Sequence, residues 1–304
     1  MLPKPRPFLE TKIRRLPEAK AVTIALGIIG ADSLIVGSDT QETYGDQKYA
    51  EGKIISGFRS APNPDGAICI SGAGAADHID AASQEILEKF QDFSGTMDEF
   101  ESWLRKFVAK FYSRHVLPFI GKTEDIPGFR LLIGCRHDRH SRLWTTARTV
   151  LTQKIPYAVV GLSMGSSNSL LSQLYPSMPS LNVTAMLATY VIRQAKLSSD
   201  GIGLETEIRF IYKEKASIIP QRVIKGWEEV FSRYQNIQHD IFSFLTSHDP
   251  LVPRIPGIVI PRTKELSQVM ADLEKMRGEL YDLPIVTGLR DFRPSTSEKS
   301  ESGQ

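Results

Sequence analysis

The chain has 304 residues, which is enough for one large hydrophobic core or for one core with an appendage,. Its 37 basic and 35 acidic side chains give a formal net charge of +2, so the basic surface typical of nucleic-acid-binding proteins is missing,. No apolar run approaches the roughly 20 residues of a membrane span, and the N-terminal segment lacks the apolar core of a secretory signal,.

Both cysteines, Cys69 and Cys135, lie in apolar runs that are typical of strands. Buried, reduced thiols of a cytosolic protein are the simplest interpretation of this placement. We therefore expect a soluble cytoplasmic protein that binds neither nucleic acid nor membrane.

The N-terminal residues 1–20 are rich in proline and basic side chains, which predicts an extended arm or a removable leader,. Apolar runs at 22–29 and 34–36 follow, separated by the turn 30–33, and they predict a β-hairpin,. Asp39 comes just past the second strand of this hairpin.

A lysine and a small-residue turn come next. Lys53 opens a third apolar run, and residues 67–71 predict a strand that leads into the small-residue turn 72–77 at the start of a helix,. A threonine near the first strand, a carboxylate, a lysine and backbone N–H groups in such a turn are the parts of a threonine nucleophile site.

Two amphipathic helices follow this turn. Residues 77–93 place apolar side chains on one helical face, and a second helix is expected to begin near Thr96, whose spacing from Glu99 fits a capping box,. Pro118 ends the second helix,. Consecutive helices after a run of strands favour a helical layer packed on a sheet.

Strands then return, and they are followed by two more helices and a last strand. The predicted strands cover 129–135, 142–146, 155–160 and 205–212, and the predicted helices cover 166–175 and 183–196. Most of these strands are linked as hairpins, which argues against a doubly wound parallel sheet.

Helical periodicity returns at 226–244 and 264–280, and the polar composition of the last fifteen residues predicts disorder,. The resulting domain boundaries are an arm at 1–20, a main domain at 21–215, a helical extension at 216–289 and a disordered tail at 290–304.

The segment 21–77 contains a Thr-Ile-Ala-Leu strand, an Ile-Val-Gly-Ser-Asp strand end, a lysine before Ile-Ile, and a Gly-Ala-Gly-Ala-Ala-Asp turn into a helix. In order and spacing these features resemble the proteasome β-subunit family of N-terminal-nucleophile (Ntn) hydrolases, including its bacterial relatives. A weaker similarity continues to about residue 212. The resemblance implies an α+β fold, a four-layer αββα sandwich, to which this chain adds a helical C-terminal extension.

The resemblance also implies a catalytic site. The nucleophile of the family is a threonine whose own α-amino group, freed by cleavage of the preceding peptide bond, acts as the base. Matched by pattern, Thr23 is the nucleophile, Asp39 and Lys53 orient and tune it, and the backbone at Ala73 and Gly74 stabilises the oxyanion,.

The register of the nucleophile is open at the level of sequence. Counting back from Asp39 without gaps selects Thr23, whereas matching the Thr-Ile-Ala-Leu run selects Ala21, which has no nucleophile. Val22 also stands where self-cleaving members of the family have glycine. As an alternative, Thr23 is an ordinary β-branched strand residue.

A second motif competes for the role of nucleophile. Ser163 is the centre of a G-x-S-x-G sequence between a predicted strand and a helix, as in a nucleophile elbow,. Asp200 or Asp240, and then His248, could complete a triad. A structural turn is the favoured interpretation, because no His-Gly-Gly oxyanion motif occurs upstream.

Three functions remain open: a proteasome-like threonine peptidase or amidohydrolase, a catalytically inactive structural subunit whose uncut arm fills the site, and a serine α/β hydrolase using Ser163. The resemblance implies that copies assemble in a ring or barrel, and it leaves an ATP-driven unfoldase open as a second partner. We expect no cofactor and no metal, because His137 and His140 lie in a charged turn without further ligands at suitable spacing,.

Overall fold

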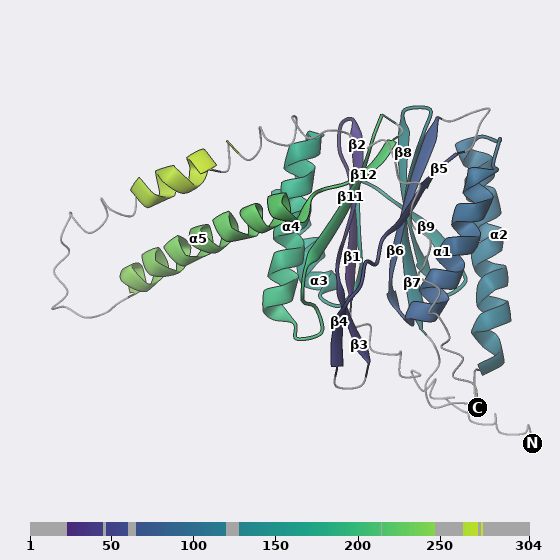
Figure 1. Ribbon diagram of the computed structural model, residues 1–304, viewed down its shortest axis with the longest axis horizontal. Coiled ribbons are helices and arrows are strands. Elements are labelled where there is room, and N and C mark those ends of the chain that lie inside the picture. The colour runs from purple at the N-terminus through teal and green to yellow at the C-terminus, as the bar shows by residue number, and fades with distance from the viewer. Residues whose placement is uncertain are drawn as a thin grey trace, which may run out of the picture.

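The computed structural model describes residues 23–44, 47–59, 65–119, 128–213, 215–246, 264–272 and 275. Two five-stranded antiparallel sheets lie face to face, and helices cover the outer face of each sheet (Figure 1). The predicted α+β fold with two antiparallel sheets and flanking helices is confirmed. The arm at 1–20, with Ala21 and Val22, and the tail at 290–304 lie outside the described residues, as does His248.

The first sheet has the strand order β10-β1-β2-β11-β12. Its strands are β1 (Ile24–Ile29), β2 (Ser33–Asp39), β10 (Tyr157–Gly161), β11 (Thr206–Tyr212) and β12 (Lys215–Ile218). β1 and β2 form the predicted hairpin, in which Ala25 lies opposite Ser38. Because both faces of this sheet are covered, every residue of β2 is buried, including the polar residues Ser33, Ser38 and Asp39,.

The second sheet has the order β5-β6-β7-β8-β9. Its strands are β5 (Ile55–Phe58), β6 (Gly66–Gly74), β7 (Phe129–His137), β8 (His140–Ala147) and β9 (Val150–Lys154). Apolar side chains such as Leu34 of β2 and Leu132 of β7 fill the space between the two sheets. Both cysteines are buried in this second sheet.

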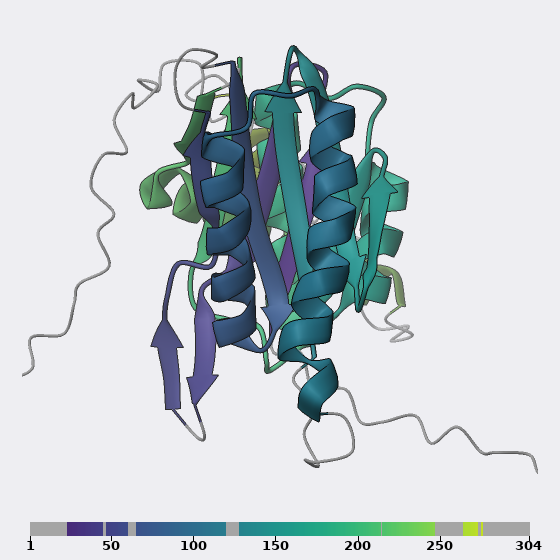
Figure 2. The same ribbon diagram turned by 90° about the vertical axis from the view of Figure 1, so that its right-hand side faces the viewer.

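The helical layers differ in their partners. α1 (Ala76–Gln91) and α2 (Met97–His115) cover the second sheet (Figure 2), and α3 (Met164–Leu174) and α4 (Leu181–Ser198) cover the first. The predicted capping box is present, since the Thr96 hydroxyl accepts a hydrogen bond from Glu99 N and the Glu99 carboxylate accepts one from Thr96 N. A single 3-10 turn, Leu117–Phe119, follows α2 at Pro118.

The sequence did not predict three parts of the sheets. A separate hairpin of β3 (Gln41–Tyr44) and β4 (Gln47–Ala50) projects from one end of the sandwich (Figures 1 and 2), and its polar sequence lacks the alternation that marks a strand,. β9 was also missed. The expectation that the strand at 205–212 is the last strand is wrong, because β12 follows it and pairs with β11.

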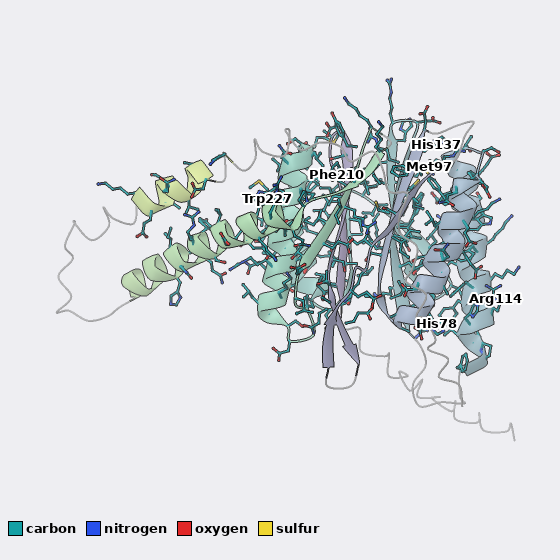
Figure 3. All side chains as sticks on the ribbon, in the orientation of Figure 1. His78, Met97, Arg114, His137, Phe210 and Trp227 are labelled. Atoms are coloured by element: carbon teal, nitrogen blue, oxygen red, sulfur yellow. The ribbon has the colours of Figure 1, made fainter. Side chains whose placement is uncertain are left out.

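The long helix α5 (Gln221–Thr246) begins against α4 and then extends away from the sandwich (Figure 1). Trp227 of α5 belongs to the same buried cluster as Phe210 of β11 (Figure 3), so the start of the helix is part of the core. A further helix at 264–272 packs on α5, where Val269 contacts the α5 face and Asp272 accepts from Arg233 at 2.6 Å.

Candidate active site

Three residues that are far apart in the sequence meet at one end of the sandwich. Thr23 immediately precedes β1, Asp39 is the last residue of β2, and Lys53 lies in the segment between β4 and β5. Thr23 is 8% exposed and Asp39 is fully buried. The structure therefore brings together the three residues that the sequence pattern selects, with Lys53 in contact with both Thr23 and Asp39.

The Lys53 ammonium group contacts each part of this cluster. Its Nζ donates hydrogen bonds to Thr23 Oγ1 and to the carbonyl oxygen of Gln41, and it lies 3.5 Å from Asp39 Oδ1. The side chain of Lys53 is 10% exposed. A lysine held in this way presents its nitrogen directly to the threonine hydroxyl.

Backbone N–H groups fix the Asp39 carboxylate. Its Oδ1 accepts from Ile24 N at 3.2 Å, and its Oδ2 accepts from Gln41 N and Gly203 N, both at 3.3 Å. Ile24 directly follows Thr23, so the same carboxylate anchors the chain that carries the hydroxyl. Such hydrogen bonds hold a buried carboxylate in one orientation.

Burial acts on both ionisable groups of the cluster. It raises the pKa of Asp39, and the nearby Lys53 ammonium and the backbone N–H groups of Ile24, Gly203 and Gln41 oppose that rise. It lowers the pKa of Lys53, and the Asp39 carboxylate opposes the decrease. The neutral amine of Lys53 is therefore accessible at a lower pH than that of an exposed lysine.

Two glycines with positive φ shape the surroundings of Thr23. Gly161 (φ +100°) ends β10, and a Cβ built there would lie 1.9 Å from the Thr23 carbonyl oxygen. The same oxygen accepts a hydrogen bond from Leu162 N at 2.9 Å. Gly74 (φ +119°) ends β6, and its added Cβ would lie 2.1 Å from Gly128 O. Neither site has room for a side chain, and both backbones favour glycine.

The register of β6 distinguishes Gly74 from Ala73. Arg59 N donates to Gly66 O and Ala75 N donates to Gly128 O, so even-numbered residues of β6 direct their N–H groups toward β5 and odd-numbered residues direct theirs toward β7,. Among the described strands, β5 pairs with β6 only as far as Ile70. The Gly74 N–H therefore points to an edge of β6 that lacks a strand partner there.

Ser163 follows Leu162, whose N–H binds the Thr23 carbonyl oxygen, but Ser163 does not lie in a nucleophile elbow. It has a left-handed conformation (φ 56°) and precedes α3. A nucleophile elbow is the strand-to-helix turn at the top of an α/β-hydrolase sheet. Here β10 is instead the edge strand of a sheet in which every pairing is antiparallel. The serine hydrolase interpretation is contradicted by this topology. The G-x-S-x-G sequence is the turn that brings Gly161 against Thr23.

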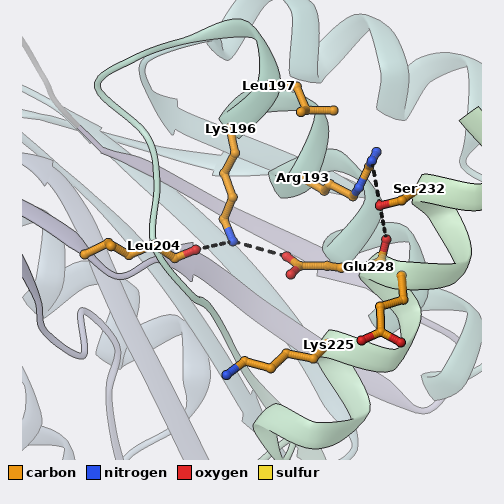
Figure 4. Close-up of a pocket in the computed structure, with 8 residues that line it drawn as sticks. Arg193, Lys196, Leu197, Leu204, Lys225, Glu228 and Ser232 are labelled. Atoms are coloured by element: carbon orange, nitrogen blue, oxygen red, sulfur yellow. Dashed lines mark hydrogen bonds and ion pairs between the residues drawn. The ribbon is translucent and has the colours of Figure 1, made fainter. Parts of the chain in front are cut away.

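A surface pocket of about 400 Å³ lies elsewhere, between α4 and α5 (Figure 4). Three of its charged side chains are engaged with protein groups: Lys196 Nζ lies 3.1 Å from a Glu228 carboxylate oxygen and donates to Leu204 O at 2.9 Å, and Arg193 donates to Ser232. This pocket has no contact with the Thr23 cluster and provides no candidate chemistry.

The described residues contain no group of three or more His, Cys, Asp or Glu side chains that could hold a metal ion. Within the same residues, no helix is long and apolar enough to cross a bilayer.

No protein-family model matches the sequence, and no curated protein is similar to it in sequence. Solved structures do match. A structure of the helical assembly of the Anbu complex from Pseudomonas aeruginosa is 12% identical, covers 76% of this chain and 100% of its own, and has a TM-score of 0.60. Anbu, an ancestral β-subunit, from Yersinia bercovieri is 14% identical over 74% of this chain and 98% of its own, with a TM-score of 0.58.

Anbu from Hyphomicrobium sp. strain MC1 is 13% identical over 75% of this chain and 100% of its own, with a TM-score of 0.57. About a quarter of the present chain lies outside the part that these structures match. The chain is thus structurally similar to the Anbu proteins and has the fold of these ancestral, proteasome-like β-subunits.

Proposed function

We propose that the protein is a threonine-type amidohydrolase of the Ntn class that acts on peptide bonds. The observation that carries this proposal is the contact between Lys53 Nζ and Thr23 Oγ1, beside a buried carboxylate that anchors the following residue. A hydroxyl becomes a competent nucleophile when a neighbouring base accepts its proton, and a buried lysine with a lowered pKa is suited to that task,.

The reaction proceeds in two steps. Thr23 Oγ1 passes its proton to the neutral Lys53 amine and attacks the carbonyl carbon, forming a tetrahedral intermediate. The negatively charged oxygen of this intermediate accepts a hydrogen bond from Gly74 N–H. We assign Gly74 as the oxyanion donor because Ala73 N–H faces β7,. The C–N bond then breaks as the leaving nitrogen takes the proton, and water hydrolyses the threonine ester.

Deacylation needs a base next to the ester. In this proposal the Val22–Thr23 peptide bond is cut, and the α-amino group of Thr23, whose ordinary pKa is about 8, deprotonates the attacking water. Asp39 acts indirectly in both steps, since it holds Lys53 and the Ile24 N–H in place.

We also propose that copies of the chain associate with one another. This rests on the similarity to a protein whose structure is described as a helical assembly. A ring and an open helix arise from the same head-to-tail contact and differ only in whether the rotation closes. Light scattering and electron microscopy of the purified protein distinguish these forms from a monomer.

A structural, non-hydrolytic subunit is the second candidate, and one observation favours it. Val22, a β-branched residue, precedes Thr23, where the resembled family has a glycine at the bond that is cut. In that case the bond before Thr23 stays uncut and Thr23 has no free α-amino group.

Hydrolysis of a set of fluorogenic peptides by the wild type and three variants tests the proposal. We expect Thr23→Ala to abolish hydrolysis, Thr23→Ser to retain part of it, and Ser163→Ala to retain most of it. Equal hydrolysis by wild type and Thr23→Ala would exclude Thr23 as the nucleophile. Absence of hydrolysis in all four proteins, when assembled, would favour the structural subunit.

A further inference from the structure

A second carboxylate, Glu207 of β11, is buried beneath the segment that carries Lys53. Glu207 is 4% exposed and lies opposite Ser38 in the first sheet. Its Oε2 accepts a hydrogen bond from Lys53 N at 3.0 Å, and its Oε1 accepts one from Arg209 Nε at 2.8 Å. Both carboxylate oxygens are therefore used inside the protein.

The backbone of Lys53 needs such an anchor because it belongs to no strand. β4 ends at Ala50 and β5 begins at Ile55, so the residues between them have no ladder hydrogen bonds. Glu51 N donates to Thr40 O at 2.9 Å at one end of this segment. The Glu207 carboxylate holds the segment at Lys53 itself.

Arg209 completes the attachment. Its Nε neutralises Glu207, and its Nη1 donates to Ser56 Oγ of β5 at 2.8 Å. The Glu207–Arg209 pair of the first sheet thus binds two points of the chain that leads into the second sheet. Lys53 lies at one of these points, and its side chain reaches back from there to Thr23.

We infer that Glu207 is the positioning residue that sets Lys53 Nζ against Thr23 Oγ1. Its hydrogen bond goes to the backbone N–H of Lys53 and not to the ammonium group, so it acts through placement of the side chain. This inference deepens the proposed function, but the placement of Lys53 can be measured whether or not the protein hydrolyses peptides.

Competitive acylation of lysines with acetic anhydride, read by peptide mass spectrometry between pH 7 and pH 11, measures that placement. In the wild type, we expect Lys53 to react more slowly than exposed lysines because Nζ is buried and hydrogen-bonded. Glu207→Gln cannot accept from both Lys53 N and Arg209. We expect it to raise the rate of Lys53 acylation about tenfold, the change that loss of one hydrogen bond to a charged group produces, and to move its pH profile toward that of an exposed lysine.

Glu205→Gln is the matched control. Glu205 lies two residues earlier in the chain, and its half-exposed carboxylate pairs with Lys225 at 2.7 Å on the surface. Its removal is expected to leave the acylation of Lys53 unchanged. If the protein hydrolyses peptides, Glu207→Gln is expected to lower kcat about tenfold with little change in KM, since the substrate contacts remain.

A second variant, Gly52→Ala, tests the same inference if Glu207→Gln does not fold. A Cβ added at Gly52 would lie 3.3 Å from Glu207 Oε2, so Gly52→Ala crowds the same carboxylate while leaving its charge in place. It is expected to change Lys53 acylation in the same direction by a smaller factor. The inference would be overturned if Lys53 were acylated at the wild-type rate and with the wild-type pH profile both in a folded Glu207→Gln protein and in Gly52→Ala. Altered Lys53 acylation without any peptide hydrolysis in the wild type would instead support the positioning role and count against the proposed reaction.

Discussion

Lys53 Nζ donates a hydrogen bond to Thr23 Oγ1, although the two residues enter different sheets. Thr23 leads into β1 of the first sheet, and Lys53 leads into β5 of the second. Their contact therefore depends on how the two sheets pack. The fold as a whole, and not one loop, positions the lysine against the hydroxyl.

Replacement of Lys53 tests its assigned role directly. Lys53→Met keeps the length and apolar stem of the side chain but removes the proton acceptor. We expect kcat for peptide hydrolysis to fall by at least about 100-fold, as for loss of a general base. Lys225→Met, which removes a surface lysine that pairs only with Glu205 among the described contacts, is expected to have wild-type activity. Equal losses in both variants would contradict the assignment.

The pH dependence follows from the burial of Lys53. Its pKa in the folded protein is lower than in the unfolded chain, so between the two values the unfolded state binds more protons,. The contribution of Lys53 to the free energy of unfolding is thus present above the unfolded pKa and lost as the pH falls through the folded pKa. Peptide hydrolysis that requires the neutral amine of Lys53 likewise increases as the pH rises, with a midpoint below the ordinary pKa of lysine.

The profile of kcat/KM against pH measures this midpoint. Lys53→Arg is the control, because guanidinium stays protonated throughout the accessible range. A rise of activity with the same midpoint in Lys53→Arg would assign the titration to another group.

Two glycines on either side of Ser163 provide a matched pair. Gly161 has φ +100° and no space for a Cβ, whereas a Cβ added at Gly165 in α3 meets nothing within 4 Å. We expect Gly161→Ala to lower the free energy of unfolding by about 2 kcal/mol or more through backbone strain, and to displace Thr23. Gly165→Ala is expected to raise it by about 0.5–1 kcal/mol. Urea unfolding compares them, and equal stabilities would refute the described approach of β10 to Thr23.

Alkylation of the two buried cysteines tests whether the second sheet is closed to solvent. Burial raises the pKa of Cys69 to about 12 and that of Cys135 further, so neither is a thiolate at pH 8,. We expect iodoacetamide to add to neither cysteine in the folded protein and to both in urea, as read by intact mass. An adduct formed at pH 8 under native conditions would show that this strand pair is open to solvent.

Local sequence patterns predicted much of the fold. The β1–β2 hairpin follows from two apolar runs around a short turn, and the start of α2 follows from the Thr96–Glu99 capping box. β3, β4 and β12 were missed because they are short, and because polar residues interrupt any alternation,. Their strand conformation depends on pairing with a neighbour, which no short window of sequence records.

The candidate site divides in the same way. The order and spacing of Thr23, Asp39 and Lys53 were visible in the sequence, and the structure places these residues together. The groups that support these residues were not visible in the sequence. Gly203, for example, donates its backbone N–H to Asp39 from 164 positions away. Glu207 likewise reaches Lys53 from 154 positions away. Such contacts arise from the packing of whole sheets and have no local signal.

The N-terminal residue of the mature protein, determined by intact mass and N-terminal sequencing after purification and prolonged incubation, tests the central claim most directly. If Thr23 is a nucleophile activated by Lys53, the wild-type chain begins at Thr23, whereas Thr23→Ala and Lys53→Met retain the residues before it. A wild-type chain that keeps those residues leaves Thr23 without a free amine and contradicts the proposed hydrolase.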